Sequence, residues 1–135
     1  MKIEDEIRVE RFPSIQQKLS INIIFTHVWA YEQLKQFFGE YGLTPQQSNV
    51  LRILRGQYPK ALTTSEIHTR MMEKNAGISR LVDRLLKKRF VEKTICEKDR
   101  RLVDVVISDK GLRVLEKMDQ NRHGIDAIYS NLSEE

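Results

Sequence analysis

The sequence contains a single cysteine, Cys96, among its 135 residues. One thiol excludes a disulfide within the chain and a metal site built from several cysteines. The three histidines, His27, His68 and His123, show neither HxH nor HExxH spacing, so a histidine-based metal site is not expected. We therefore predict no metal and no cofactor.

Proline and glycine are also scarce, with three and six residues, and the apolar stretches stop far short of the roughly 20 residues that cross a bilayer. Hydrophobic residues at 40% and charged residues at 31% favour a helix-rich globular chain over a disordered or all-β one. The acidic start at residues 4–6 is unlike a signal peptide. We expect one cytoplasmic domain with no membrane segment.

The motifs of common enzymes are missing as well. The sequence has no GxGxxG, no Gly-Lys-Ser/Thr loop, no GxSxG and no cysteine–histidine arrangement. No motif in it indicates a catalytic nucleophile or a phosphate-binding loop. We predict that the chain is not an enzyme.

Positive charge is present but concentrated in one segment. Residues 63–101 contain eleven Lys or Arg against six Asp or Glu, a net charge of +5, whereas the whole chain has a net charge of +4. Such a basic segment is typical of a protein that binds nucleic acid. An ordinary solvated patch is the alternative reading of this charge.

Within that segment, residues 75–89 (NAGISRLVDRLLKKR) have the period of an amphipathic helix. We expect Asn75 to cap this helix and Asp83 to pair with Lys87 four residues later. The apolar face holds Ile78, Leu81, Val82, Leu85 and Leu86, and the opposite face holds Ala76, Arg80, Asp83, Arg84 and Lys87. One face packs against the domain, and the other faces a partner or water.

Two further helix starts precede this segment. In LTPQQSNVLRIL, Thr44 is a capping residue followed by proline and by the glutamine of a capping box, which predicts a helix to about Gly56. In TTSEI, Thr63 and the following glutamate repeat the capping box, which predicts a short helix to about Met71. Two helices joined by a tight turn, the second of them basic, match the helix-turn-helix pattern.

The remaining elements flank this pattern. In FVEKTICEKDRRLVDVVIS, β-branched residues alternate with polar ones on either side of a charged centre, which predicts a β-hairpin. Ser108 then caps a final helical region from Asp109 onward. Near the start, Ser14 caps a long helix that ends near Gly39 and is apolar on more than one face. A helix of this kind in a small domain suggests that a second subunit covers it.

A helix-turn-helix followed by a β-hairpin is the winged-helix arrangement. The motifs LTPQQSNVLRIL, SRLVDRLLKKRFVEK, DRR and VVISDKG, in this order across residues 43–117, resemble those of the MarR family (multiple antibiotic resistance regulators) of bacterial transcription factors. The resemblance implies a mostly α fold with a small β-hairpin wing (α+β). A winged helix-turn-helix lobe at 43–108 would be flanked by dimerisation helices at 1–42 and 109–135.

The resemblance also implies a homodimer that places two lobes in successive major grooves of a palindromic operator in double-stranded DNA. Such dimers usually repress, and many release DNA when a small aromatic ligand or an oxidant alters the spacing of the lobes. Relatives hold ligands between the first long helix and the DNA-binding lobe. The family usually closes its dimer with a longer final helix. Either the sequence is short here or the dimer depends more on the long first helix, and we expect a dimer that is weaker than usual.

The DNA contacts that the resemblance implies begin on the second helix of the motif. Ser79 and Arg80 match the family positions that reach base edges. Arg84, Lys87 and Lys88 lie further along, where phosphate contact is more plausible. Further contacts at the helix starts are expected from Thr63, Thr64, Ser65, Asn75, Ala76 and Gly77.

At the wing, Arg101 corresponds to the arginine that the family inserts into the minor groove. Lys98 and Arg100 are expected to contact DNA beside it, and Asp99 is expected to orient a wing arginine through a local ion pair.

Several alternatives stay open. Lys87, Lys88 and Lys98 could simply be solvated, and Gly77 stands where many relatives have a polar residue. Cys96 lies in the wing strand and not near the chain start, where the family's sensing cysteines lie, so ordinary packing is its expected role. A winged-helix module that binds protein instead of DNA is the alternative function, although its signature, a neutral or acidic recognition helix, is absent.

Overall fold

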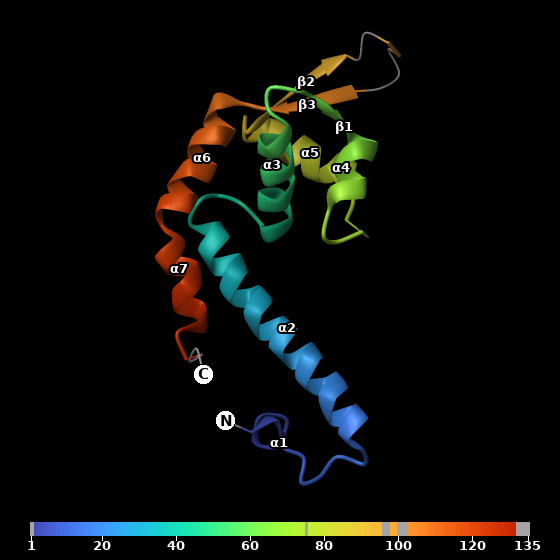
Figure 1. The fold of residues 1–135 in the computed structure, drawn as a ribbon, viewed down its shortest axis with the longest axis vertical. Coiled ribbons are helices and arrows are strands. Elements are labelled where there is room, and N and C mark those ends of the chain that lie inside the picture. The colour runs from blue at the N-terminus through green and yellow to red at the C-terminus, as the bar shows by residue number, and fades with distance from the viewer. Residues whose placement is uncertain (1, 75, 96–97, 100–102, 132–135) are drawn as a thin grey trace.

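The computed structural model describes residues 2–74, 76–95, 98–99 and 103–131, and it shows a long helix leading into a helical lobe with a small sheet at its edge (Figure 1). The helices before the sheet hairpin are α1 (Ile3–Glu6), α2 (Ile15–Gly39), α3 (Pro45–Gln57), α4 (Thr64–Arg70) and α5 (Ile78–Lys87). The strands are β1 (Leu62–Thr63), β2 (Val91–Ile95) and β3 (Val103–Ile107). The chain then forms α6 (Asp109–Gln120), α7 (Arg122–Asp126) and a 3₁₀ turn, η1 (Ala127–Tyr129).

Four of the helices begin where their capping residues predict. The side chains of Ser14, Thr44, Thr63 and Ser108 each accept a hydrogen bond from the backbone N–H three residues later, at the starts of α2, α3, α4 and α6. Thr44 and Thr63 form complete capping boxes with the third residue of the helix. These short-range bonds fix the helix boundaries of the lobe and confirm the predicted element order.

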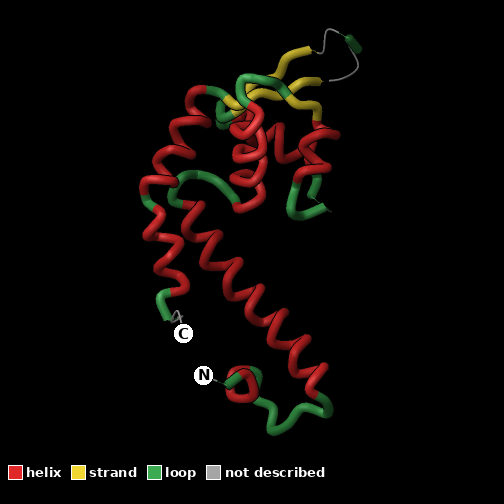
Figure 2. The backbone as a smooth tube through the Cα atoms, viewed as in Figure 1, coloured by secondary structure: helices red, strands yellow, loops and turns green. Residues whose placement is uncertain are grey.

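The sheet is antiparallel, with strand order β1-β3-β2 (Figure 2). The predicted hairpin is confirmed, with Val91 opposite Ile107 and Ile95 opposite Val103. The third strand, β1, pairs Leu62 with Val105 and was not predicted. It joins the start of α4 directly to the wing, so the helix-turn-helix and the hairpin form one packed unit.

The core lies between α3, α5, α6 and the inner face of the sheet. Buried side chains on these elements form one cluster, and β3 contributes Val105 and Ile107 from its inward-facing positions. The helices contribute Val50, Leu51, Leu54, Leu81, Val82, Leu85, Leu115 and Met118. Because α5 buries its apolar face in this core, its polar face is fixed outward.

The long helix α2 extends away from the lobe (Figure 1), and among its residues only Phe37 is buried. Large apolar side chains remain exposed along it: Ile15, Leu19, Ile23, Ile24, Val28 and Trp29. The C-terminal segment returns along α2, where the rings of Trp29 and Tyr129 lie 6.1 Å apart. No helix in the described part of the chain is long and apolar enough to span a membrane.

One predicted boundary is wrong. Helix α5 begins at Ile78 with Gly77 as its N-cap residue, so Asn75 does not cap it and Ala76 and Gly77 precede its first turn. The Ala76 N–H donates to the Glu73 carbonyl, so the chain is still turning at this point. The final helical region begins at Asp109 as predicted and continues through α6, α7 and η1, with a break between α6 and α7 at Asn121.

Candidate nucleic-acid interface

The outer face of α5 carries the side chains predicted to read DNA. Ser79, Arg80, Arg84 and Lys87 are all exposed, whereas Ile78 and the other core residues of the helix are buried. The two faces of the helix are therefore separated as the sequence period predicts. The basic side chains project outward from a rigidly packed support.

The turn between α4 and α5 is held by hydrogen bonds from α3. Gln46 Nε2 donates to Glu73 Oε2 at 2.6 Å, and the Met72 N–H donates to Asn49 Oδ1 at 3.1 Å. Lys74 Nζ donates to the carbonyl of Thr69 at the end of α4. These bonds fix the approach of the chain into α5, and with it the direction of the outer face.

The start of α4 presents hydroxyl groups to the same side. The Thr63 hydroxyl is engaged in the helix cap, because it accepts from the Glu66 N–H and donates to Glu66 Oε2, both at 3.2 Å. The hydrogen bond from the Thr63 backbone N–H lowers the pKa of Glu66 and outweighs the opposing effect of burial. Thr64 is half-buried and Ser65 is exposed.

These hydroxyl groups converge with α5 and the wing around a small cavity of about 240 Å³. Its lining comes from β1, α4, α5, β2 and β3 and consists of Thr63, Thr64, Ser65, Ser79, Val82, Asp83, Lys93 and Val103. Lys93 was not identified from the sequence, where its only signal was a positive charge within the predicted hairpin. The structure thus brings together four predicted site residues, from the end of β1 and from two helices, and adds one cation from the wing.

Asp83 does not make the predicted intrahelical pair with Lys87. Its Oδ1 atom lies 3.0 Å from Lys93 Nζ, which joins the outer face of α5 to β2. The hairpin brings Lys93 back alongside the helix, a long-range approach that helical spacing cannot reveal. Lys87 is exposed and has no ion pair within the described residues.

Lys88 is also placed differently from the prediction of a phosphate contact. Its Nζ atom donates to the Gly42 carbonyl at 2.5 Å and to Gln47 Oε1 at 3.1 Å, so the side chain turns back toward the α2–α3 connection. Lys88 is the C-cap residue of α5 and lies past the outward-facing part of the helix. Its ammonium group therefore forms hydrogen bonds within the lobe.

The tip of the wing is only partly described. Lys98 is exposed and Asp99 is half-buried. The predicted contacts of Asn75, Arg100 and Arg101, and the predicted packing role of Cys96, lie outside the described residues. The ion pair predicted between Asp99 and a wing arginine cannot be placed for the same reason, since both arginines are outside that set.

Known proteins share this arrangement. The model of the MarR family matches residues 41–102, which run from the α2–α3 connection to the wing. The HTH-type transcriptional repressor MdtR of Bacillus subtilis (strain 168) is 32% identical over 119 residues, covering 87% of this chain and 74% of MdtR. The match extends beyond the lobe into the long helices.

Solved structures agree with this match. A MarR transcription factor from Planctomyces limnophilus is 29% identical and superposes with a TM-score of 0.77, covering 90% of this chain and 88% of that one. A mutant MarR from E. coli, complexed with operator DNA, shares the fold at 22% identity with a TM-score of 0.74, covering 86% and 83%. The chain therefore belongs to the MarR family and is a DNA-binding transcriptional regulator of this type, not an enzyme.

Proposed function

We propose that the protein is a homodimeric repressor that binds a palindromic operator through the outer face of α5. The observation that carries the proposal is the exposed row of Arg80, Arg84 and Lys87 on a helix whose other face is buried in the core. The relative MdtR is named as a repressor, and a MarR of the same fold has been crystallised with operator DNA. Both support the same mode of action here.

Each residue is assigned a role by its place on this face. Ser79 and Arg80 lie in the first turn of α5, and we assign them to base edges in the major groove. Arg84 and Lys87 follow one and two turns later, where a straight helix leaves the curved groove, and we assign them to phosphates. Contacts to the DNA backbone come from the starts of the two helices of the motif, through Thr63, Thr64, Ser65, Asn75, Ala76 and Gly77.

The wing contacts the minor groove in this proposal. Arg101 enters the groove, and Lys98 and Arg100 lie against the adjacent phosphates. Asp99 holds a wing arginine in place. The pair between Asp83 and Lys93 supports the proposal, because it ties the wing strand to α5 and sets the distance between the two DNA-binding elements.

A second copy of the chain covers the exposed apolar side chains of α2, with residues 1–42 and 109–135 forming the dimer interface. A small aromatic ligand relieves repression by binding between α2 and the lobe. A cavity of about 690 Å³ lies there, within the size range of ligand sites, and His27, Tyr31 and Met72 are among its lining residues. Gln46, Asn49 and Glu73, which hold the turn before α5, also line it.

The test is selection of bound duplexes from a random pool, followed by operator affinity against salt for the wild type, Arg80→Ala and Arg101→Ala. We expect a palindrome with half-sites about one helical turn apart and a steep salt dependence. Loss of one arginine contact should weaken operator binding by about tenfold or more. Arg122→Ala on α7 removes the same side chain outside the surface assigned to DNA. Because α7 belongs to the proposed dimer region, sedimentation must first show that this variant is dimeric, and the dimeric variant should bind as the wild type does.

A different result would favour the alternative function, a winged-helix module that binds protein instead of DNA. If no sequence is enriched, and weak binding is indifferent to Arg80→Ala and Arg101→Ala, the α5 face does not read DNA. The winged-helix lobe would then be a protein-interaction module.

A further inference from the structure

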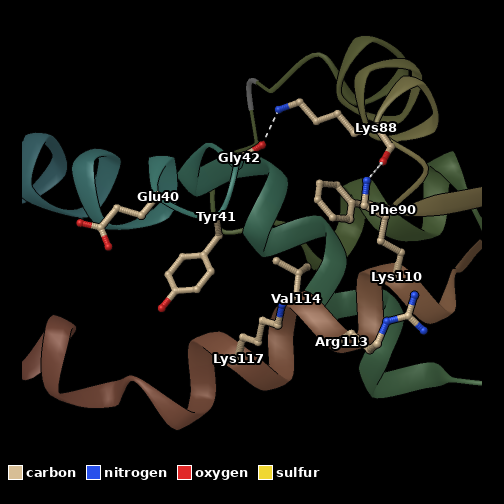
Figure 3. A pocket seen from close by; sticks show the side chains of 9 residues that line it. All are labelled: Glu40, Tyr41, Gly42, Lys88, Phe90, Lys110, Arg113, Val114 and Lys117. Atoms are coloured by element: carbon tan, nitrogen blue, oxygen red, sulfur yellow. Dashed lines mark hydrogen bonds between the residues drawn. The ribbon is translucent and has the colours of Figure 1, made fainter.

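A third cavity lies on another side of the lobe, between the α2–α3 connection, the end of α5 and α6 (Figure 3). Its volume is about 580 Å³, which is within the range of small-molecule sites. It shares no lining residue with the cavity beneath α2 or with the α4–α5 surface assigned to DNA. A ligand bound here would therefore not compete directly with DNA for those residues.

The cavity is strongly basic. Four of its nine lining residues are cations, Lys88, Lys110, Arg113 and Lys117, and Glu40 is its single carboxylate, which gives a formal net charge of +3. The Glu40 carboxylate points away from the cations (Figure 3), and it forms no ion pair within the described residues. A concave surface of one charge sign concentrates ions of the opposite sign.

The cations keep hydrogen-bond donors to spare. Lys88 uses two of its three N–H groups, on Gly42 and Gln47, and Lys110 uses one, on the Lys88 carbonyl at 2.8 Å. In the described part of the chain, Arg113 and Lys117 have no ion pair or side-chain hydrogen bond. Several unfilled N–H donors around one cavity suit an anionic group with several oxygen acceptors.

The wall between the cations is apolar. Val114 lies between Phe90 and Tyr41 (Figure 3), and the Lys110 ammonium sits 4.8 Å from the centre of the Phe90 ring. The Tyr41 hydroxyl accepts a hydrogen bond from Asn121 Nδ2 at 2.9 Å, which holds its ring in place. A fully hydrated inorganic ion would gain nothing from this wall, whereas an apolar body attached to the anion would be buried against it.

We propose that this cavity binds a small organic dianion, a phosphate monoester or a dicarboxylate, with an apolar body. Arg113 and Lys117 bind the anionic group, with the spare donors of Lys110 beside them, and Val114 and Tyr41 contact the apolar body. This site is additional to the aromatic-ligand cavity under α2 and does not depend on how the protein reads DNA.

Isothermal titration calorimetry of the full chain would test the proposal with four probes: phenyl phosphate, isophthalate, inorganic phosphate and neutral benzyl alcohol. We expect at least one of the two organic dianions to bind with a Kd below about 1 mM, and their relative affinities to decide between phosphate and dicarboxylate. Inorganic phosphate and benzyl alcohol should each bind about tenfold more weakly or not at all, because inorganic phosphate lacks the apolar body and benzyl alcohol lacks the anionic group.

Matched variants locate the binding. Arg113→Gln combined with Lys117→Gln should weaken the better dianion by about tenfold or more, and Arg122→Gln, which removes an exposed arginine outside the cavity, should leave it unchanged. All three positions are exposed, so the fold should survive, as circular dichroism would verify. The proposal is overturned if neither dianion binds the wild type, if inorganic phosphate binds as tightly as phenyl phosphate, or if the double variant and Arg122→Gln bind alike.

Discussion

At the scale of single residues, Asp119 joins two helices that are far apart in the sequence. Its Oδ1 atom lies 3.0 Å from Arg52 Nη1 and its Oδ2 atom lies 2.6 Å from Arg55 Nη1, so one carboxylate on α6 binds two arginines of α3. Burial raises the pKa of Asp119, but hydrogen bonds from Arg55 and Arg52 outweigh that effect and leave it below the ordinary value of 3.8. The side chains are about one-third exposed, so solvent screens the pair.

This depressed pKa predicts a pH-dependent contribution to stability. A carboxyl whose pKa is lower in the folded chain stabilises it fully above the unfolded pKa and loses that effect as the pH falls through the folded value. Asp119→Asn should therefore lower the free energy of unfolding by up to about 1 kcal/mol at neutral pH. The difference from the wild type should shrink as the pH falls below about 4, measured by urea denaturation across that range.

The control for this prediction is Glu92→Gln on β2, outside the proposed dimer region. Glu92 is exposed and has no ion pair within the described residues, so its variant should follow the wild-type stability at every pH. An Asp119→Asn deficit that stays constant into acid would mean that the carboxylate's charge is not what stabilises the contact.

At the scale of elements, α6 packs so closely on the α5–β2 junction that its first turn has no room for a side chain. A Cβ atom at Gly111 would meet the Phe90 carbonyl oxygen and lie 2.6 Å from Ile107 Cγ1. Gly111→Ala should therefore lower the free energy of unfolding by about 1 to 3 kcal/mol through overpacking, as measured by urea denaturation.

Gly56 in α3 supplies the matched control. An added Cβ there would meet no heavy atom within 4 Å, and alanine favours a helix over glycine by up to about 1 kcal/mol. Gly56→Ala should leave the stability unchanged or raise it slightly. Equal losses for the two variants would show that close packing of α6 is not the cause.

The helix boundaries show which parts of the fold a sequence can predict. Ser14, Thr44, Thr63 and Ser108 were identified correctly because a capping bond joins residues only three apart. The start of α5 was misplaced because its N-cap residue, Gly77, has no side chain to signal the position. Strand β1 was missed because two residues carry no detectable alternation, and only pairing with the distant β3 defines them.

The same distinction applies to the candidate interface. Helical period alone placed Arg80, Arg84 and Lys87 on the outside of α5, because a buried apolar face determines the opposite face. The partners of Asp83 and Lys88 were wrong because Lys93 and Gly42 reach them only through the tertiary fold. Local patterns therefore predict which way a side chain faces, and long-range packing decides what it binds.

At the scale of the whole molecule, the exposed apolar surface of α2 is not explained by one chain alone. Ile23 and Ile24 are each 60% exposed in the middle of a helix that extends away from the lobe (Figure 1). Fully burying an exposed side chain of this size contributes about 1.5 to 3 kcal/mol of favourable free energy, so association of two copies of the chain along α2 is favourable. The dimer proposed above accounts for this surface.

An aspartate in the middle of that surface should therefore separate the subunits. In sedimentation equilibrium at micromolar concentration, the wild type should have twice the chain mass of 15.9 kDa, and Ile23→Asp should shift toward 15.9 kDa, because an interface cannot bury an unpaired carboxylate cheaply. Ile95→Asp makes the same chemical change at a residue that is 69% exposed on β2, and it should stay dimeric. A monomeric wild type, or an Ile23→Asp chain that remains dimeric, would remove α2 from the interface. A monomer would also have no means of holding two α5 helices one DNA turn apart, so a monomeric result would contradict the proposal of a palindromic operator as well.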